Sequence, residues 1–286
     1  MNRHPIYIPS KGRADSRLTV KTLDSMKVNY KVVIEKQEYK TYSKVIKKKN
    51  ILVLDEKYQD NYDTCDNLGD TKSKGPGAAR NFAWEHSVSE GYKRHWVMDD
   101  NIKGFYRLNK NLKIKAYTGA IFKAMEDFCE RYTNVTMAGP NYLFFAKQNQ
   151  KLPPFITNTR IYSCNLINNT PYRWRGRYNE DTILSLDMLK DGYCTVQFNA
   201  FLQGKVRTQV LRGGNSEEFY DKEGTLPKSQ MQVNVHPDVS KLVYKFGRIH
   251  HQVNYSKFKA NKLIKKKDIK IEQGINEYGM KLKQIK

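Results

Sequence analysis

The stretch KGPGAARNFAWEHSVSEGYKRHWVMDDN, from Lys74 to Asn101, decides the expected fold. It predicts a helix that opens on glycines and runs into a short buried strand. Gly75 and Gly77 let the backbone approach a phosphate closely, and the N-terminus of the helix favours negative charge. The strand ends in three residues with hard oxygen ligands for a divalent cation: Asp99, Asp100 and Asn101. In this order the features predict a site for a diphosphate and a metal, whereas singly they describe a capped surface helix and an acidic turn.

Short apolar strands alternate with amphipathic helices before this stretch. The expected elements are, in chain order, a strand at 4–10, a helix at 18–26, a strand at 30–36, a helix at 37–46 and a strand at 51–56. This alternation predicts a mainly parallel sheet with helical crossovers. The acidic residues after the strand at 95–100 would then lie at the carboxyl ends of the strands, where open α/β sheets bind ligands.

The residues after this stretch extend the sheet with mixed strands. The expected elements are a helix at 116–132, strands at 135–147 and 160–169, a helix at 179–193, a strand at 194–203, a glycine-rich loop at 211–224 and a helix at 226–238. We therefore predict an α/β fold with a Rossmann-like, mixed and mainly parallel sheet flanked by helices. It should form a single large domain over residues 1–258, followed by a basic C-terminal extension over 259–286.

The charge of the chain points to a polyanionic partner. The 286 residues have a formal net charge of +22. An excess of this size predicts attraction to nucleic acid. The alternative is an anionic membrane surface, which would require a basic amphipathic helix with a bulky apolar face, and no segment shows one clearly.

Neither disulfides nor membrane segments are expected. The four cysteines are widely spaced without a CxxC motif, so reduced thiols are predicted rather than a disulfide framework or a zinc site. No apolar stretch approaches the length of a membrane-spanning helix, and the polar start has no signal-peptide core. We expect a cytoplasmic protein with no membrane partner.

A second acidic pair, Glu180 and Asp181, precedes the helix expected at 179–193. A carboxylate fixed there is a candidate general base. Transfer of a glycosyl group to a hydroxyl needs such a base, together with a Lewis acid on the departing diphosphate. The alternative is that the pair only complements the helix N-terminus. His250 and His251, in GRIHHQVNY, are candidates either for a further metal ligand or for a structural role.

Polar and cationic residues near the first strands are candidates for donor binding. Ser10 and Arg13 in IPSKGRAD and Arg80 in GAARN lie where a diphosphate or a uracil ring would be met. Glu35, just after the second strand, is a candidate to recognise the edge of a base. Each of these side chains could equally be a solvated surface group.

Basic and aromatic residues alternate in the segment YRWRGRY, immediately before the second acidic pair. An enzyme acting on a nucleobase needs stacking surfaces for the unstacked base and cations for the backbone. The alternative is half-buried aromatic rings with arginines that extend outward. The candidate DNA-binding residues in this segment are Arg173, Trp174, Arg175, Arg177 and Tyr178.

Three motifs occur in one order: IPSKGRAD near the start, GPGAARNFA before a strand ending in MDDN, and NED before a helix. In this combination the chain, from about Pro5 to the histidine segment, resembles the TET-associated glycosyltransferases of bacteriophages, which are similar to GT-A glycosyltransferases. The resemblance implies a GT-A-like DNA base glycosyltransferase that uses a nucleotide-sugar donor, usually a UDP-sugar, with Mn²⁺ or Mg²⁺. It implies as acceptor the hydroxyl of a 5-hydroxymethylpyrimidine in DNA.

The same resemblance implies roles for particular residues. Asp99 and Asn101 occupy the two ends of a DxD-like motif, with Asp100 between them. Asp99 is a candidate donor-binding residue that would accept from a ribose hydroxyl, while Asp100 or Asn101 meets the metal. Asp181 matches the usual acceptor base. The last position of the motif is Asn rather than Asp, which shifts the expected metal ligation toward Asp100 and a histidine. The donor-binding segments contain Arg13 and Arg80.

Three other functions stay open. A glycosyltransferase acting on a glycan or a protein would have no evident use for a net charge of +22. A non-catalytic nucleic-acid-binding protein of the same fold would not need two intact acidic clusters. A metal nuclease also uses acidic pairs with Mg²⁺, but it would leave the glycine-opened helix unexplained.

Overall fold

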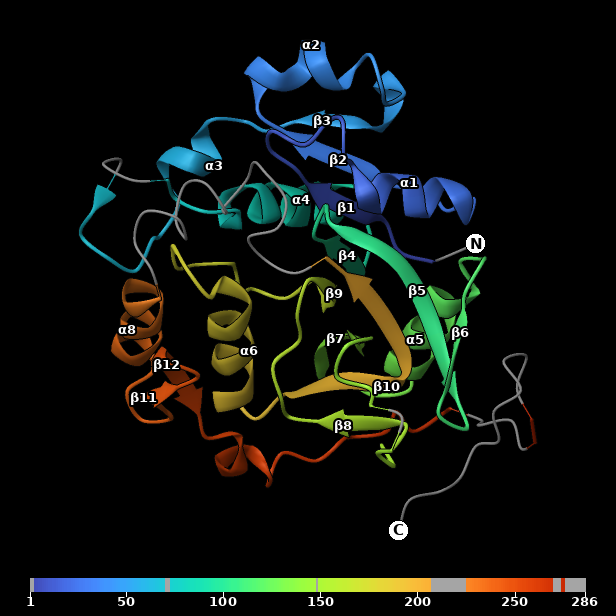
Figure 1. The fold of residues 1–286 in the computed structure, drawn as a ribbon, viewed down its shortest axis with the longest axis vertical. Helices are drawn as coiled ribbons and strands as arrows, with labels where there is room; N and C mark the ends of the chain where they lie inside the picture. Colours follow the sequence, from blue (N-terminus) through green and yellow to red (C-terminus); the bar gives the residue numbers. More distant parts are fainter. Residues whose placement is uncertain (1–2, 70–72, 148, 207–224, 270–273, 276–286) are drawn as a thin grey trace.

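One twisted sheet organises the chain, shown as a computed structural model in Figure 1. The structure describes residues 3–69, 73–147, 149–206, 225–269 and 274–275. Within them the sheet has ten strands in the order β3-β2-β1-β4-β9-β7-β10-β5-β6, with β8 paired to β10. These strands are β1 (Ile6–Pro9), β2 (Lys31–Ile34), β3 (Ile51–Val53), β4 (Arg94–Met98), β5 (Ile102–Asn109), β6 (Leu112–Lys115), β7 (Val135–Tyr142), β8 (Phe155–Thr157), β9 (Cys164–Asn168) and β10 (Cys194–Lys205).

Helices cover both faces of this sheet. Apolar residues of α1, α2 and α5 share one hydrophobic core, and those of α4 and α6 pack on the opposite face. Alternate residues of a strand point to opposite faces, so Ile6 and Ile8 belong to the first core and Tyr7 to the other side. The helices are α1 (Leu18–Ser25), α2 (Tyr39–Tyr42), α3 (Lys57–Asp60), α4 (Gly77–Ser89), α5 (Ala120–Cys129), α6 (Glu180–Lys190) and α8 (Leu226–Val235).

The strand order reverses beside β1. Strands β2 and β3 follow on one side of β1, β4 pairs with its other side, and all four are parallel. The carboxyl ends of β1 and β4 are therefore neighbours at the switch point where open α/β sheets bind ligands. Among the ten strands described, only β5, β8 and β9 run against the direction of β1. The prediction of a mixed, mainly parallel sheet flanked by helices is confirmed.

Some predicted elements were wrong in extent. The strand expected at 135–147 ends at Tyr142 and continues as a loop. The helix expected at 37–46 is reduced to a 3-10 turn and the short α2. The β5–β6 hairpin was not predicted, because the exposed LKIK of β6 is held by pairing with β5 rather than by burial. The glycine-rich loop expected at 211–224 lies outside the described residues.

The C-terminal residues pack against α6. Helix α8 is followed by a two-stranded sheet, β11 (Ser240–Lys245) and β12 (Arg248–Val253). Phe258 joins Leu186 of α6 in an apolar cluster. The chain then returns to the main body, where Lys266 N donates to Arg131 O at 2.9 Å. The boundary predicted at residue 258 therefore falls within a segment that stays bonded to the domain.

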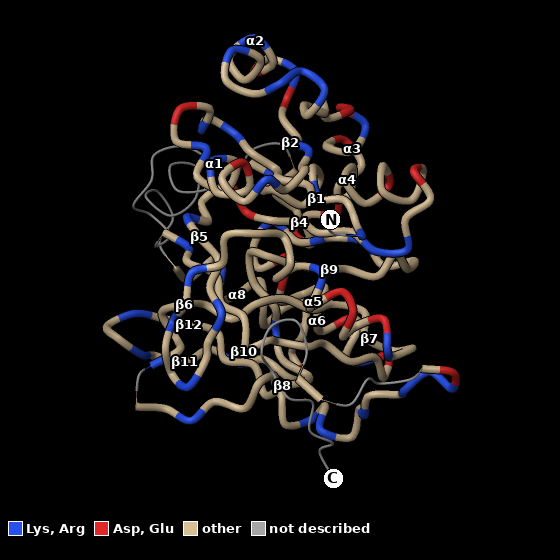
Figure 2. Tube along the Cα trace, turned by 90° about the vertical axis from the view of Figure 1, so that its right-hand side faces the viewer, with Lys and Arg blue, Asp and Glu red and all other residues tan. Residues whose placement is uncertain are grey.

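The structure locates the four cysteines and shows where basic side chains gather. All four cysteines are free, and three of them are buried. No helix in the described part of the chain is long and apolar enough to cross a membrane. Figure 2 shows lysines and arginines around α2 and along the β5–β6 and β11–β12 hairpins.

Candidate active site

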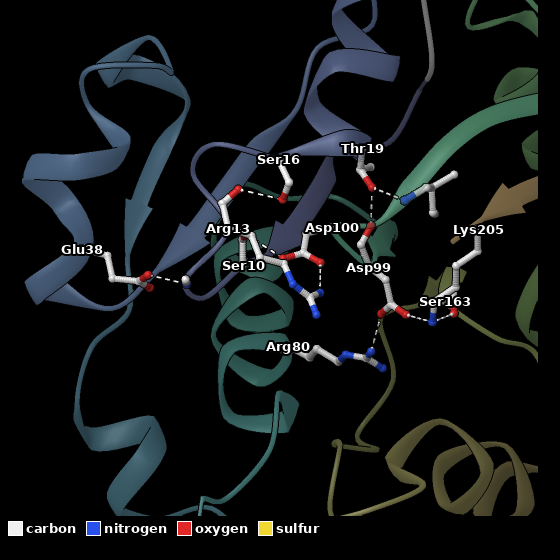
Figure 3. Close-up of polar contacts among 12 residues, drawn as sticks. Ser10, Arg13, Ser16, Thr19, Glu38, Arg80, Asp99, Asp100, Ser163 and Lys205 are labelled. Carbon is white, nitrogen blue, oxygen red and sulfur yellow. Dashed lines mark hydrogen bonds and ion pairs between the residues drawn. The ribbon is translucent and has the colours of Figure 1, made fainter. Parts of the chain in front are cut away.

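The loop after β1 binds the acid that follows β4 (Figure 3). Ser10 Oγ donates to Asp100 Oδ2 at 2.8 Å, and Arg13 Nη1 donates to Asp100 Oδ1 at 2.6 Å. The Tyr42 hydroxyl supports the loop from 2.7 Å away from Ser10 Oγ. Burial raises the pKa of Asp100, and Arg13 opposes that rise. Two predicted donor residues, Ser10 and Arg13, are thus joined to the MDDN segment at the switch point.

Asp99 is bound by two cations. Its Oδ1 accepts from Arg80 Nη2 at 2.8 Å, and its Oδ2 accepts from Lys205 Nζ at 2.7 Å. Lys205 also donates to Ser163 Oγ at 2.8 Å, which connects the end of β10 to the residue before β9. Burial raises the pKa of Asp99, but Lys205 and Arg80 outweigh it and lower the pKa to about 2. Asp99 is therefore an anion at neutral pH.

Arg80 joins the two acidic clusters. It is 4% exposed, and its Nη1 lies 3.2 Å from Glu180 Oε1 while its Nη2 binds Asp99. The guanidinium also lies over the ring of Trp174, 4.6 Å from the ring centroid. Burial lowers the pKa of Arg80, and Glu180 and Asp99 more than compensate, so the pKa is raised. One buried cation thus holds the start of α6 against the end of β4.

Glu180 and Asp181 have different surroundings. Glu180 is bound to Arg80, and burial raises its pKa. Asp181 Oδ1 accepts from Thr182 N at 2.8 Å, whereas Oδ2 makes no hydrogen bond within the part of the chain that the structure describes. Asp181 is half-buried, and its charge acts on Lys205. A carboxylate oxygen without a partner, on a side chain near enough to Lys205 for its charge to act there, is suited to accept a proton.

Glu35 lies at the same edge of the sheet, directly after β2. Its carboxylate accepts from Gln59 Nε2 at 3.1 Å and lies 3.4 Å from Lys11 Nζ. Because β2 is the neighbour of β1, these contacts hold Glu35 beside the loop that contains Arg13. The position agrees with donor recognition, which stays a prediction.

The two glycines before α4 pack against the chain itself. A Cβ at Gly77 would lie 1.8 Å from Tyr62 Oη, and a Cβ at Gly75 would lie 2.7 Å from Arg177 O. Tyr62 Oη donates to Gly176 O at 2.8 Å, so these segments are in direct contact. Gly75 also has a φ of +77°, which few other residues adopt. Internal packing therefore explains both glycines, and their approach to a phosphate stays a prediction.

The aromatic rings of the segment predicted to contact DNA are buried, and its arginines are paired within the protein. Trp174 and Tyr178 are 1% and 6% exposed, so in this arrangement neither ring can stack on a nucleobase. The reason is that aromatic residues alternating with arginines are also the pattern of a buried strap held by ion pairs. This corrects the interpretation of YRWRGRY. Its arginines pair with carboxylates: Arg173 with Glu85, Arg175 with Asp187 and Arg177 with Asp66.

The histidines of β12 are not part of a preformed metal cluster. His250 Nε2 accepts from Arg248 Nε at 3.3 Å. Burial lowers the pKa of His251 to about 3. In the described ranges, no three His, Cys, Asp or Glu side chains are grouped so as to hold a metal ion.

The MDDN segment nevertheless fits a metal ion that is carried by a diphosphate. Asn101 is 7% exposed, and its Oδ1 is buried without a hydrogen-bond partner among the described residues. Nucleotide-bound Mg²⁺ needs only one or two protein ligands, because phosphate oxygens and water complete its coordination. Asp100 and Asn101 would supply those ligands.

Sequence reasoning missed residues from the other half of the sheet that act on Asp99 or Asp181. The Tyr142 hydroxyl lies 2.8 Å from Ser163 Oγ, and the rings of Tyr142 and Tyr162 are 5.1 Å apart. Lys205 could have been found from the sequence, because it follows an expected strand and the ends of strands are where α/β sheets bind ligands. The residues missed are Tyr142, Arg160, Tyr162, Ser163 and Lys205.

The fold and the site together define an α/β protein with acidic and cationic side chains paired at the switch point of its sheet. The sequence profile of the TET-associated glycosyltransferase family matches residues 4–214, and the chain belongs to this family. It is therefore a glycosyltransferase.

Two solved structures show weaker likenesses. A Desulfovibrio desulfuricans protein named as a nucleotide-diphospho-sugar transferase is similar over 83% of this chain and 96% of its own, at 10% identity and a TM-score of 0.40. The mannose-6-phosphate isomerase of Helicobacter pylori is similar over 93% of this chain and 94% of its own, at 11% identity and a TM-score of 0.29. Likenesses this weak decide nothing about the chemistry. No curated protein matches the chain.

Proposed function

We propose that this glycosyltransferase moves a sugar from a nucleotide-sugar of the UDP type to the hydroxyl of a 5-hydroxymethylpyrimidine in DNA. The observation that supports it most is the bridge by which Arg80 joins Asp99 to Glu180. The bridge brings the switch point of the sheet next to Asp181, a carboxylate with an available oxygen. The net charge of +22 favours a DNA acceptor over a glycan.

The donor would lie over the carboxyl ends of β1 and β4. Arg13, Arg80 and Lys205 are the cations nearest to its diphosphate in this arrangement, and each is held in place by an aspartate. Cations held this way need little reorganisation when a phosphate arrives, which is the condition for electrostatic stabilisation. Glu35 would contact the nucleoside from the end of β2.

Asp181 accepts the proton of the acceptor hydroxyl as the hydroxyl oxygen bonds to the anomeric carbon of the sugar. The bond between that carbon and the diphosphate oxygen breaks, and its electron pair leaves with the diphosphate. Lys205 and Arg80 stabilise the charge that develops on the leaving group. A Mn²⁺ or Mg²⁺ ion held by the diphosphate, Asp100 and Asn101 would supply Lewis-acid stabilisation of the same charge.

Glu180 acts as a positioning residue in this scheme. Its carboxylate is bound to Arg80 and is not available to an acceptor. It keeps the guanidinium between β4 and α6, and so sets where the diphosphate meets the base Asp181. Its removal would weaken donor binding, whereas removal of Asp181 would stop proton transfer.

The test is a transfer assay with a panel of nucleotide-sugars and three acceptors: duplex DNA with 5-hydroxymethylcytosine, the same duplex with unmodified cytosine, and a glycan mixture. Mass spectrometry of the digested nucleosides should show a hexosyl or pentosyl adduct on the hydroxymethylated base alone. Transfer to the glycans with none to DNA would show that DNA is not the acceptor. Donor binding without any transfer would favour a non-catalytic protein of this fold.

A further inference from the structure

A pocket of about 240 Å³, lined by both amide and apolar side chains, lies between the end of β7, the loop after it, β8 and β10. Strand β10 pairs with β7 on one side and with β8 on the other, so this is the lower part of the sheet in Figure 1. No role in the scheme above is assigned to it. The side chains that matter here are Asn141, Phe145, Tyr162, Gln197 and Asn199.

The pocket presents amide groups that are held in place. Asn199 Nδ2 donates to Pro153 O at 2.9 Å, and Asn141 Nδ2 donates to Asn199 Oδ1 at 2.9 Å. Gln197 Nε2 donates to the same Asn199 oxygen at 3.3 Å. The Gln197 carbonyl Oε1 makes no hydrogen bond within the described residues, although Gln197 is only 8% exposed. A fixed amide with an open acceptor can read the edge of a planar polar ring.

Flat and apolar side chains complete the walls. Phe145 and Tyr162 supply aromatic rings, and Ile156 lies opposite Gln197 across the β8–β10 pair. Arg160 lies over the ring of Tyr162, 4.0 Å from the centroid. A nucleobase taken out of the helix is held in this way, by stacking on apolar or aromatic groups and by hydrogen bonds to its edge.

A short chain of contacts connects the pocket to the donor side. The Tyr162 ring touches that of Tyr142, and the Tyr142 hydroxyl lies 2.8 Å from Ser163 Oγ. Ser163 Oγ accepts from Lys205 Nζ, which binds Asp99, as Figure 3 shows. Tyr142 and Ser163 therefore lie between the Tyr162 wall of the pocket and Lys205, the cation proposed to meet the diphosphate.

The rim of the pocket suits a polyanion. The described loop residues 143–147 and 149–153 contribute one wall and expose Lys147 and Lys151, and Phe144 is 70% exposed. Exposed cations and aromatic rings beside a pocket are what a nucleic-acid backbone and its neighbouring bases require. Binding of a donor sugar alone would not require exposed cations and aromatic rings at this rim.

We propose that this pocket receives the acceptor base, a 5-hydroxymethylpyrimidine flipped out of the duplex, with Gln197 on its hydrogen-bonding edge and Phe145 and Tyr162 against its faces. The proposal rests on the proposed function, because it names where the DNA acceptor of that reaction binds.

Two variants test it, with a duplex that carries 2-aminopurine beside a single 5-hydroxymethylcytosine. The fluorescence of 2-aminopurine rises when its neighbour leaves the stack, so the wild-type protein should raise it on binding. Gln197→Leu and Phe145→Ala should each suppress the rise and increase the KM for DNA roughly fivefold or more, with the KM for the donor unchanged. Phe145 is 47% exposed, so its replacement should not compromise folding.

Gln252→Leu is the matched control, since Gln252 has the same side chain as Gln197, is exposed on β12 and does not line the pocket. It should keep the wild-type fluorescence response and KM. Suppose the wild-type protein transfers sugar to this duplex, but Gln197→Leu and Phe145→Ala both behave like the wild type. This result would show that the acceptor base does not bind in this pocket, while the proposed function would stand. Failure of the wild-type protein to transfer sugar to any hydroxymethylated duplex would instead overturn the proposed function, and the acceptor pocket with it.

Discussion

Asp99 and Glu180 lie on either side of one guanidinium group: Arg80 Nη2 is 2.8 Å from Asp99 Oδ1, and Nη1 is 3.2 Å from Glu180 Oε1. The end of β4 and the start of α6 are thereby tied together through a buried charge. Removing either carboxylate leaves that cation short of a partner, which is costly in a dry site. The stability and the chemistry of the site therefore both depend on Arg80.

Asp181→Asn should reduce transfer by about 10²–10⁴-fold, because the asparagine cannot accept the proton of the acceptor hydroxyl. Binding of UDP, followed by isothermal calorimetry, should be unchanged. Glu180→Gln should behave differently, since its carboxylate holds Arg80, and should raise the KM for the donor more than it lowers kcat. A variant Asp181→Asn that turns over at the wild-type rate would remove Asp181 from the role of base.

Asp99 should make stability depend on acidic pH. Its pKa is about 2 in the folded protein, below its ordinary value of 3.8. A depressed pKa stabilises the fold above pH 3.8 or so, by about 2 kcal/mol, and that stability is lost as the pH falls toward 2. Urea unfolding of the wild type and Asp99→Asn should therefore differ most near pH 6 and converge near pH 2. A difference that is constant across this range would contradict the ion pairs described for Asp99.

Metal binding should require the nucleotide. Asp99 and Asp100 already bind Arg80, Lys205 and Arg13, so without a nucleotide these carboxylates offer a metal ion little uncompensated negative charge. We expect Mn²⁺ alone to leave the melting temperature unchanged and Mn²⁺ with UDP to raise it by more than UDP alone. EDTA should abolish transfer. Strong binding of Mn²⁺ to the protein without UDP would point to a separate metal site.

Lys147→Glu and Lys151→Glu should weaken DNA binding by changing phosphate contacts. Each should reduce the slope of log K against log salt concentration by about 1, with similar losses for modified and unmodified duplexes. Lys44→Glu, an exposed lysine just after α2, is the control of equal charge and should have a smaller effect. Fluorescence anisotropy at several salt concentrations measures all three. Equal losses for the three variants would mean that DNA is held by diffuse charge.

Arg177→Met should impair stability rather than DNA recognition. Arg177 is buried, and its guanidinium binds Asp66 with Nε at 2.8 Å from Oδ2. Leaving Asp66 unpaired should cost about 3 kcal/mol. Urea unfolding measures this loss, and the folded variant should bind the modified duplex as the wild type does. A stable variant with weakened DNA binding would restore the DNA role first given to this segment.

The N-terminal half of the sheet could be predicted because its signals are local. Apolar strands alternate there with helices, and the polar residues after β1 and β4 mark the edge where ligands bind. The same reasoning brought Ser10, Arg13 and Arg80 to this edge. It could not supply their partners, since an ion pair such as that of Asp99 with Lys205 joins residues far apart in the chain.

The interpretation of the YRWRGRY segment failed for a related reason. Alternation of rings and cations describes a nucleic-acid surface and an internal strap equally well until the positions of the carboxylates are known. Asp66, Glu85 and Asp187 come from three different parts of the chain, and each pairs with one of these arginines. Phe144 and Lys147, by contrast, were not recognised as exposed residues, because the strand predicted to contain them is five residues too long.

Strand β10 contains Gln197 in one part and ends at Lys205, and its register with β7 shifts between Phe198 and Leu202. If acceptor and leaving group are contacted at these two points, the length of one strand determines how far apart the reactants are held. From Phe198 to Leu202 the pairing with β7 advances by only one residue, so residues inserted or deleted in this bulge would change the spacing by less than the roughly 3.3 Å per residue of a regular strand. Related enzymes that accept bulkier bases should therefore differ in the bulge of this strand.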